Sequence, residues 1–335
     1  MTDQADFALA VHRVAVPDPS SNACWSPFSV ASALALAREA ARGETRAELD
    51  ALLTDFDASD SLDVPELAVA NTLWADDYLT LNPDFSLAKS VRRTAFSDPQ
   101  TVRKLVNTDV AETTRGLIPE LLTSPPPPDA AAIIVNALYL KVGWLNPFAA
   151  WETAARPFHA PGGDVDVPTM KVTEKFRYAH HNGWQTVVLP AASGVEAVIL
   201  LPDTSLDQPL DASAFEAANR VNLELSLPKV DVREKFQLKN VLARLGVERM
   251  FTRAADFSGL SPDQRMFVDE VIHEAVLRVD EEGLEGAAAT AVTFRTVSIE
   301  IPTEPIVVTV DRPFLLAVRH ARSKAIYFLA QVARP

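Results

Sequence analysis

The sequence predicts an α+β protein in which helices dominate the first part of the chain and strands dominate the rest. Three observations lead to this prediction. Segments of helical length and composition fill much of residues 29–122, four consecutive prolines at 125–128 can continue neither a helix nor a central strand, and short segments rich in β-branched residues follow from residue 131. Helices followed by a series of strands are typical of the α+β class.

The helical part begins with residues 29–42, which are rich in Ala and Leu and end before Gly43. A second helix is expected directly after it, at residues 44–53, because its apolar residues recur with helical spacing. Further along, the patterns predict a strand at residues 67–73 and helices at residues 83–93 and 102–122.

The strand-rich part consists of short apolar segments, several of which are bounded by Pro or Gly. Residues 222–227 alternate strictly between polar and apolar side chains, as in a strand with one buried face. The predicted strands are residues 131–140, 186–189, 195–201, 222–227, 266–279, 297–310, 314–318 and 325–332, with one helix at residues 232–245. Because no internal repeat and no linker is visible, we expect residues 1–335 to form a single domain.

The composition argues against several classes of partner. The chain has 31 Lys and Arg against 45 Asp and Glu, a net charge of −14, and its longest basic tract spans residues 89–93. Because binding to nucleic acid or to an anionic membrane requires clustered positive charge, we expect neither as a partner. Cys24 is the single cysteine, so neither an intrachain disulfide nor a cysteine metal cluster can form.

The N-terminus gives an expectation about location. It reads MTDQADFALAVHRV, without the basic start, apolar stretch or cleavage site of a secretory signal. No apolar run approaches the ~18 residues of a membrane-spanning helix. The expectation is a cytoplasmic protein, with export by a route that needs no recognisable signal left open.

Enzymatic chemistry is not predicted. The chain lacks the G-x-S-x-G nucleophile elbow, the G-x-G-x-x-G dinucleotide loop and the G-x-x-x-x-G-K-[ST] phosphate loop. None of the six histidines has the spacing of a zinc site, and the adjacent His180 and His181 would point to opposite faces of a strand. Cys24 is interpreted as a buried, inert thiol. We therefore expect no catalytic residues, no metal and no cofactor.

One segment resembles neither a hydrophobic strand nor a turn. Residues 281–292 read EEGLEGAAATAV and lie between strand-like neighbours. With a period of two, the side that runs from Leu284 to Phe294 is uncharged and the other side carries all of the charge. Two interpretations remain open: a flexible acidic surface loop, or a strand of small residues that could enter an existing sheet.

A resemblance favours the second interpretation. The segment resembles the hinge of the serpins, whose usual form is E-E-G-[ST]-E-A-A-A-A-T-A, and other segments resemble motifs of that family in the family's order. They are SPFS at residues 26–29, NALYLKVGW at residues 136–144 followed by Pro147 and Phe148, LPK at 227–229, ADFSG at 255–259, VIHEAV at 271–276 and DRPFL at 311–315. On these motifs the sequence is identified as a member of the serpin family.

The resemblance implies a fold and a mechanism. The serpin fold has N-terminal helices packed on large, mostly antiparallel sheets and an exposed reactive-centre loop, here at about residues 281–305. The implied function is a monomeric suicide inhibitor, not an enzyme. In the family, a serine protease cleaves the loop and forms an acyl-enzyme, and it is trapped when the loop inserts into the main sheet. Such a native state is metastable.

The family's spacing also implies a reactive bond. It falls fourteen residues after Gly283, between Val297 and Ser298. A small apolar residue at this position implies an elastase-like target. Phe294 would instead suit a chymotrypsin-like protease and Arg295 a trypsin-like one, and both are kept as alternatives.

Other site residues are implied by the matching motifs. Four residues match the shutter, a buried polar cluster under the centre of the main sheet: Ser26, Ser29, Asn136 and His273. Trp144 and Lys229 match the breach, where insertion begins, and Lys229 is expected to pair with Glu281. The hinge comprises Glu281, Gly283, Leu284, Gly286, Ala287, Ala288, Ala289, Thr290 and Ala291.

The chain departs from the family pattern at two hinge positions. Leu284 replaces the usual Thr or Ser, and Gly286 replaces Ala, so a bulky side chain and an extra flexible residue could both slow insertion. The acidic charge and a shortened segment between residues 54 and 105 imply no activation by glycosaminoglycans. The alternative function is a non-inhibitory serpin that acts as a carrier or a chaperone-like binder, and a hydrolase is third.

Overall fold

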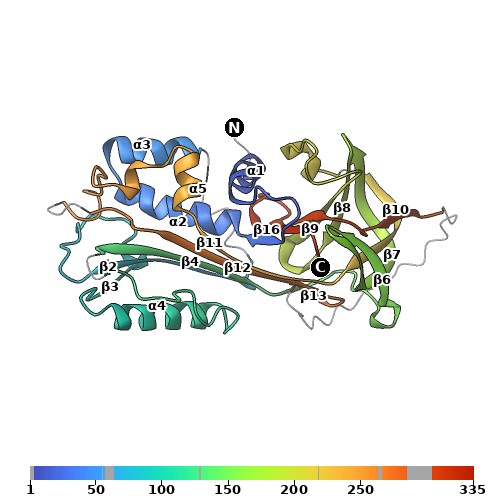
Figure 1. Ribbon diagram of the computed structural model, residues 1–335, viewed down its shortest axis with the longest axis horizontal. Helices are drawn as coiled ribbons and strands as arrows, with labels where there is room; N and C mark the ends of the chain where they lie inside the picture. Colours follow the sequence, from blue (N-terminus) through green and yellow to red (C-terminus); the bar gives the residue numbers. More distant parts are fainter. Residues whose placement is uncertain are drawn as a thin grey trace.

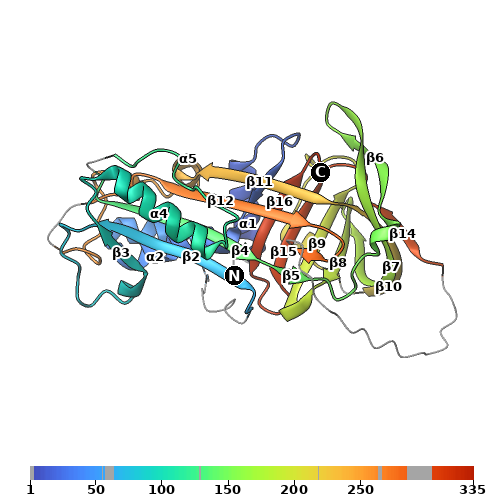
Figure 2. The same cartoon turned by 90° about the horizontal axis from the view of Figure 1, so that it is seen from below.

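The computed structural model describes residues 4–54, 56, 64–127, 130–217, 219–262, 266–284 and 304–335. Two large sheets follow each other along the long axis of the molecule (Figure 1). Helices α2 (Pro27–Ala40), α3 (Gly43–Leu52) and α5 (Lys239–Arg244) lie on one side of the seven-stranded sheet, and α4 (Pro99–Thr113) lies on its other side (Figures 1 and 2). Helix α1 (Gln4–Ala15) packs against α5 and the nine-stranded sheet. This arrangement confirms the prediction of an α+β fold with helices packed on large sheets.

The helices are α1 (Gln4–Ala15), α2 (Pro27–Ala40), α3 (Gly43–Leu52), α4 (Pro99–Thr113) and α5 (Lys239–Arg244), with short 3-10 turns at η2 (Ala88–Ser90), η3 (Ala150–Glu152), η4 (Ala192–Gly194), η5 (Ala212–Phe215) and η6 (Arg249–Phe251). The start of α2 is fixed locally. The Ser26 hydroxyl accepts a hydrogen bond from the Ser29 N–H, and Pro27 fills the first helical position, where no N–H is needed. Most residues of α2 are buried, so this helix lies inside the protein.

The seven-stranded sheet carries the site described below. Its order is β3 (Val91–Thr94), β2 (Leu67–Asp76), β4 (Ala132–Leu140), β12 (Val271–Val279), β13 (Gly283–Leu284) and β5 (Val142–Gly143), and β11 (Val230–Gln237) also pairs with β12. The central neighbours β4 and β12 run parallel, whereas β2 and β4 are antiparallel.

The nine-stranded sheet forms the other end of the molecule. Its order is β1 (Ala23–Trp25), β16 (Ile326–Val332), β15 (Phe314–His320), β9 (Val195–Pro202), β8 (Trp184–Pro190), β7 (Gly163–His181), β10 (Asn219–Pro228) and β14 (Ile306–Thr309), with β6 (Ala154–Ala160) paired to β7. β14, the first described strand after residue 303, pairs in parallel with β10 and ends the order.

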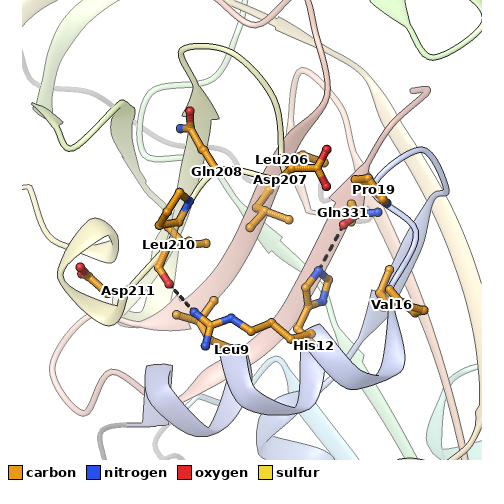
Figure 3. A pocket seen from close by; sticks show the side chains of 14 residues that line it. Leu9, His12, Val16, Pro19, Leu206, Asp207, Gln208, Leu210, Asp211 and Gln331 are labelled. Atoms are coloured by element: carbon orange, nitrogen blue, oxygen red, sulfur yellow. Dashed lines mark hydrogen bonds between the residues drawn. The ribbon is translucent and has the colours of Figure 1, made fainter.

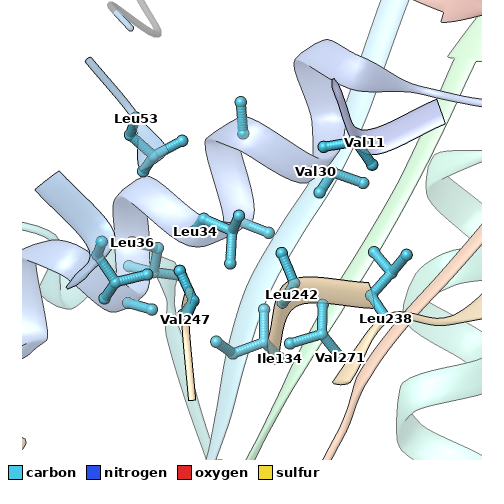
Figure 4. Packing of buried hydrophobic residues seen from close by; sticks show 14 of the residues in the cluster. Val11, Val30, Leu34, Leu36, Leu53, Ile134, Leu238, Leu242, Val247 and Val271 are labelled. Carbon is cyan, nitrogen blue, oxygen red and sulfur yellow. The ribbon is translucent and has the colours of Figure 1, made fainter. Parts of the chain in front are cut away.

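The largest core lies between the helices and the seven-stranded sheet. Leu34 of α2 packs there above Ile134 of β4 and Val271 of β12, and Leu242 of α5 closes the same layer (Figure 4). A second core contains the inner face of the nine-stranded sheet, and a third lies under α4. Among the described residues, no helix is both long enough and apolar enough to cross a bilayer.

Three predicted helices differ from the structure. Residues 83–93 contain only η2 and the start of β3, because Val91–Thr94 pairs with the end of β2. Residues 102–122 are helical only to the end of α4, since Arg115 and Gly116 adopt positive φ angles of 52° and 82° that terminate a helix. Residues 232–245 contain most of β11 and the short α5, because residues 230–237 pair with β12, and the first four of them alternate between buried and exposed.

The predicted strands differ from the structure less than the predicted helices do. The strand predicted at residues 266–279 begins at Val271, and within the range 297–310 only β14 is described, since residues 297–303 lie outside the described residues. The elements that the sequence did not predict include α1, β6 and the long β7. β7 has charged residues along much of its length and is stabilised by its pairing with β6, β8 and β10.

Candidate functional site

A row of polar residues crosses the middle of the seven-stranded sheet. Asn71 on β2 lies opposite Asn136 on β4, and Asn136 lies opposite His273 on β12. Residues that oppose each other on neighbouring strands point to the same face of a sheet. Asn136 and His273 are fully buried, so their polar atoms need partners inside the protein.

The partners come from the start of α2. His273 Nε2 accepts a hydrogen bond of 2.9 Å from the Ser26 backbone N–H, and Asn136 Nδ2 donates one of 2.8 Å to the Ser29 carbonyl. The other imidazole nitrogen, Nδ1, lies 2.9 Å from Asn136 Oδ1. Because an amide oxygen can only accept, Nδ1 carries the proton and the imidazole is neutral. Burial agrees with this, since it lowers the pKa of His273 to about 3.

The structure thus brings Ser26, Ser29, Asn136 and His273 together in one buried network between α2 and the sheet. Sequence reasoning missed Asn71, which belongs to the same row. The available signal was an amide in the middle of the predicted strand at residues 67–73. Asn71 Oδ1 and Ser29 Oγ have no hydrogen-bond partner, so the row has unused hydrogen-bonding capacity.

Beyond this row, β4 and β12 pair at one more position and then no longer pair with each other. β4 and β12 pair only over residues 134–137 and 271–274. At the far end of β12, the two residues of β13 lie between β12 and β5, with Leu284 opposite both Val279 and Val142. Leu284 is 1% exposed. The first hinge residues therefore already form part of the sheet.

Position 283 requires glycine, because β13 lies very close to the backbone of β5 there. A Cβ atom on Gly283 would lie 2.3 Å from the carbonyl oxygen of Val142 and 2.7 Å from the Cα atom of Gly143. Real Cβ atoms do not come so close to backbone, so no larger residue fits without displacing a strand. The position is determined by space and not by a positive φ angle.

Glu281 is held by side chains and backbone. Its carboxylate lies 2.7 Å from Lys229 Nζ and accepts a hydrogen bond of 2.8 Å from the Thr153 hydroxyl. Its carbonyl accepts a hydrogen bond from the Phe148 N–H. Although burial acts to raise the pKa of Glu281, the hydrogen bonds from Lys229 and Thr153 hold that pKa below its ordinary value. Lys229 therefore meets Glu281 as expected, and Thr153 is a partner that the sequence did not indicate.

Trp144 contacts the same turn. Its indole N–H donates a hydrogen bond of 2.9 Å to the Asp280 carbonyl, and its backbone N–H donates one of 2.9 Å to the Glu282 carbonyl. The Asp280 carboxylate accepts hydrogen bonds from the N–H groups of Glu282 and Gly283. The turn between β12 and β13 is thus held in one conformation, with Trp144 beneath it.

Part of the predicted site lies outside the described residues. These positions are Gly286, Ala287, Ala288, Ala289, Thr290, Ala291, Phe294, Arg295, Val297 and Ser298. In the described part, no cluster of three or more His, Cys, Asp or Glu side chains could bind a metal ion. Cys24 is fully buried, and burial raises the pKa of its thiol.

A separate pocket of about 530 Å³ lies between α1 and the nine-stranded sheet (Figure 3). Leu9 and Leu210 contribute apolar walls, and Arg13 donates a hydrogen bond to the Leu210 carbonyl. His12 lies 3.4 Å from the Gln331 side-chain oxygen, and burial lowers the pKa of His12 to about 4. The pocket therefore combines apolar walls with Arg13, the neutral His12 and the carboxyl side chains of Asp207 and Asp211.

Comparisons with known proteins agree with this architecture. The family model described as "Serpin (serine protease inhibitor)" matches residues 2–335. Serpin A3-8 of Bos taurus is 32% identical over 374 residues, covering 100% of this chain and 88% of the relative. An uncharacterized serpin-like protein of Thermococcus kodakarensis is 30% identical over 348 residues, covering 94% of this chain and 81% of the relative.

Solved structures give the same fold. Uncleaved ovalbumin has a TM-score of 0.85 at 22% identity, with 99% of this chain and 98% of that chain covered. Thyroxine-binding globulin in complex with thyroxine has a TM-score of 0.83 at 24% identity, with the same coverage. These matches indicate no catalytic enzyme family, and a metastable conformational change is characteristic of the fold. The chain belongs to the serpin family, whose members generally act on serine proteases as inhibitors.

Proposed function

We propose that this serpin inhibits a serine protease by the suicide-substrate mechanism, with its reactive loop cleaved between Val297 and Ser298. The observation that carries the proposal is the position of Gly283 and Leu284 between β12 and β5, where an inserting strand would begin. Entry of more residues would extend ladders that already exist, so insertion needs no new nucleation.

The register of these ladders supports the proposal. Thr290 lies six residues after Leu284, and the residues six positions before the two ladder partners of Leu284 are Asn136 and His273. Continued without a bulge, both ladders therefore bring Thr290 to the same place, between Asn136 and His273. Those two residues are themselves opposite each other in the structure. A threonine hydroxyl can donate and accept hydrogen bonds, as this polar row requires.

The same register fits the size and charge of other loop residues. Ala288 would lie opposite Leu138 and Ala275, which are both 0% exposed, so a small side chain suits that position. Glu285, on the other face, would lie opposite Lys141 and Arg278 and would meet two positive charges. The alternation predicted from the sequence is therefore compatible with insertion.

The chemistry begins as ordinary proteolysis. The protease serine oxygen attacks the Val297 carbonyl carbon, the bond to the Ser298 nitrogen breaks, and that nitrogen leaves with a proton as the new amine. Val297 stays bound to the protease as an ester. About fourteen inserted residues at about 3.3 Å each would move the attached protease by roughly 46 Å before water hydrolyses the ester. The small Val297 favours an elastase-like target, with Phe294 or Arg295 as alternative reactive residues for chymotrypsin- or trypsin-like proteases.

The experiment is incubation with elastase, chymotrypsin, trypsin and subtilisin, followed by denaturing electrophoresis. A serpin–protease complex that survives SDS, together with a C-terminal peptide whose mass begins at Ser298, is the expected result. Cleavage of the loop without a complex and without a rise in the melting temperature would contradict the inhibitory function. A peptide that begins at Arg295 or Thr296 would instead move the reactive bond to Phe294 or Arg295.

A second function, a carrier of small molecules, is favoured by the pocket beside α1. Its volume of about 530 Å³ lies in the usual range of ligand sites, and its apolar walls with Arg13, Asp207 and Asp211 suit an amphipathic ligand. Titration with 8-anilinonaphthalene-1-sulfonate tests this, with Arg13→Ala expected to weaken binding at least fivefold. Equal fluorescence from both proteins would exclude this pocket as the site. A chaperone-like role is not favoured by any described contact.

A further inference from the structure

Exposed large apolar side chains gather where the chain enters and leaves residues 285–303. In the described residues the large apolar side chains with high exposure are Tyr78, Leu105, Leu145, Trp151, Phe267, Ile306 and Val307. Leu145 and Trp151 belong to residues 144–153, which hydrogen-bond to the turn at residues 280–283 between β12 and β13, here called the hinge turn. Ile306 and Val307 begin β14. Four of these seven side chains therefore flank the two ends of the loop segment.

Trp151 is the most exposed of them. It is 86% exposed, whereas the other four tryptophans, Trp25, Trp74, Trp144 and Trp184, are between 1% and 5% exposed. A tryptophan offers about 150–250 Å² of contact surface, and tryptophans are enriched among the residues that dominate binding energy at interfaces. A single tryptophan left in solvent is thus a candidate contact for another protein.

The position of Trp151 is fixed with respect to the loop. It lies in η3, between Phe148 and Thr153, and both of these residues hydrogen-bond to Glu281. Leu145, which is 48% exposed, follows Trp144 in the same stretch. A partner that reaches the chain beyond Leu284 would therefore meet a tryptophan whose backbone is already held next to the turn.

Acidic residues accompany this stretch of chain. Glu152 follows Trp151 and is exposed, Glu282 in the turn between β12 and β13 is exposed, and Glu281 in the same turn is paired with Lys229. The chain as a whole has a net charge of −14. Such a surface attracts a partner with positive charge near its contact patch. Two apolar side chains cover far less than the roughly 1,000 Å² that a stable dimer needs, so a second copy of this chain is not favoured. A protease that also binds the loop in its active site would gain the rest of its interface there.

We propose that Trp151 and Leu145 form a docking surface for the captured serine protease, outside the reactive bond, and that this surface fits a protease with an apolar patch bordered by positive charge. This inference rests on the proposed inhibitory function and adds to it a residue that determines which proteases are captured quickly. Docking would raise the rate of encounter without changing what happens to the acyl-enzyme.

Association kinetics test the proposal, with the protease that gives an SDS-stable complex with the unmodified chain. Trp151→Ala should lower the second-order rate constant of inhibition at least tenfold, and Trp151→Phe should restore part of it. The stoichiometry of inhibition and the melting temperature should not change. Tyr78→Ala, which removes a 57% exposed side chain away from the hinge turn, is the matched control and should stay within twofold.

A rate for Trp151→Ala within twofold of the unmodified chain would overturn the proposal. A changed stoichiometry with an unchanged rate would also overturn it, because that result would assign Trp151 to support of the hinge. If no protease gives a complex, the proposed function fails and this inference fails with it. If a complex forms but Trp151→Ala leaves the rate unchanged, only this inference fails, so the two failures are distinguishable.

A direct observation uses the chain labelled with 5-fluorotryptophan and a protease whose active-site serine is replaced by alanine. Of the five fluorine resonances, the one missing in Trp151→Phe is expected to shift when the inactive protease is added, while the four buried tryptophans keep theirs. A complex in which the Trp151 resonance stays unchanged would contradict the docking surface. A shift that depends on the concentration of this chain alone would assign the surface to a second copy instead.

Discussion

His273 Nδ1 lies 2.9 Å from Asn136 Oδ1, and the two residues stand opposite each other in the only stretch of ladder that β12 and β4 share among the described residues. On one side of this bond the strands pair directly. On the other side they pair once more, at Glu274 and Ala137, and then separate, and the two residues of β13 lie between β12 and β5. The bond therefore marks the position where the sheet must open if another strand is to enter.

His273→Ala should destabilise the native protein by about 3 kcal/mol. The substitution removes the acceptor of the buried Ser26 N–H and the donor to Asn136, and each unsatisfied buried group costs about 1–3 kcal/mol. The midpoint of urea unfolding is the measurement. His181→Ala is the control, since His181 lies exposed at the end of β7 and should change the midpoint little. Equal midpoints for the two variants would contradict a structural role of the row.

Stability should fall as the pH decreases from about 6.5. Burial lowers the pKa of His273 to about 3 and that of His12 to about 4, from an ordinary value of 6.5. Between these values the unfolded chain binds protons that the native state does not, so the free energy of unfolding decreases by up to about 1.4 kcal/mol per pH unit for each histidine. The lowered pKa of Glu281 acts in the same direction below its ordinary value, and the raised pKa of His159 acts against it.

Urea unfolding between pH 4.5 and pH 7.5 measures this dependence. His12→Gln should reduce the slope between pH 5 and pH 6 by about one proton, because glutamine does not titrate. An unchanged slope would mean that His12 is protonated in the native protein.

Gly283→Ala should release the two residues of β13 from the sheet. The added Cβ would lie 2.3 Å from the Val142 carbonyl oxygen, which is backbone and cannot turn away. The expected result is faster cleavage by thermolysin after residue 283 and a lower melting temperature. Gly246→Ala is the control, because Gly246 has a φ of 91° and open space around it, so it tests backbone strain alone. Equal cleavage rates for Gly283→Ala and the unmodified chain would contradict the tight fit.

Lys229→Ala should loosen the hinge turn more than removal of an exposed ion pair does. The Glu281 carboxylate is 14% exposed and also binds Thr153, so loss of Lys229 should cost about 1 kcal/mol. Arg278→Ala removes a pair in which both side chains are at least half exposed, and it should cost less than about 0.5 kcal/mol. Hydrogen exchange of the Phe148 amide, which donates to the Glu281 carbonyl, should quicken only in the first variant.

Local patterns were sufficient to predict the elements whose neighbours in sequence determine them. The Ala- and Leu-rich composition of residues 29–42 predicts most of α2, and the apolar run at residues 131–140 predicts β4. β11 was missed because residues 230–237 carry four charged side chains and adopt a strand only through pairing with β12. Tertiary pairing outweighs local propensity there.

The candidate site was predicted in part for the same reason. Family motifs identified Asn136 and His273, but the place of Asn71 depends on the register between β2 and β4, which are joined by a long connection. Thr153 was missed because its partner Glu281 is 128 residues away. Contacts of this kind are not visible in a sequence pattern and follow only from the arrangement of the strands.

Thr290→Arg should convert the protein from an inhibitor into a substrate. In the register of β13, residue 290 reaches the row of Asn136 and His273, where a guanidinium would be buried without a counter-charge, and this stops insertion. The protease should still cleave the loop, so the SDS-stable complex should disappear while the cleaved band increases. Glu285→Gln is the matched control, because residue 285 would lie opposite Lys141 and the exposed Arg278, and it should keep the complex. A complex formed equally by Thr290→Arg and the control would refute insertion in this register.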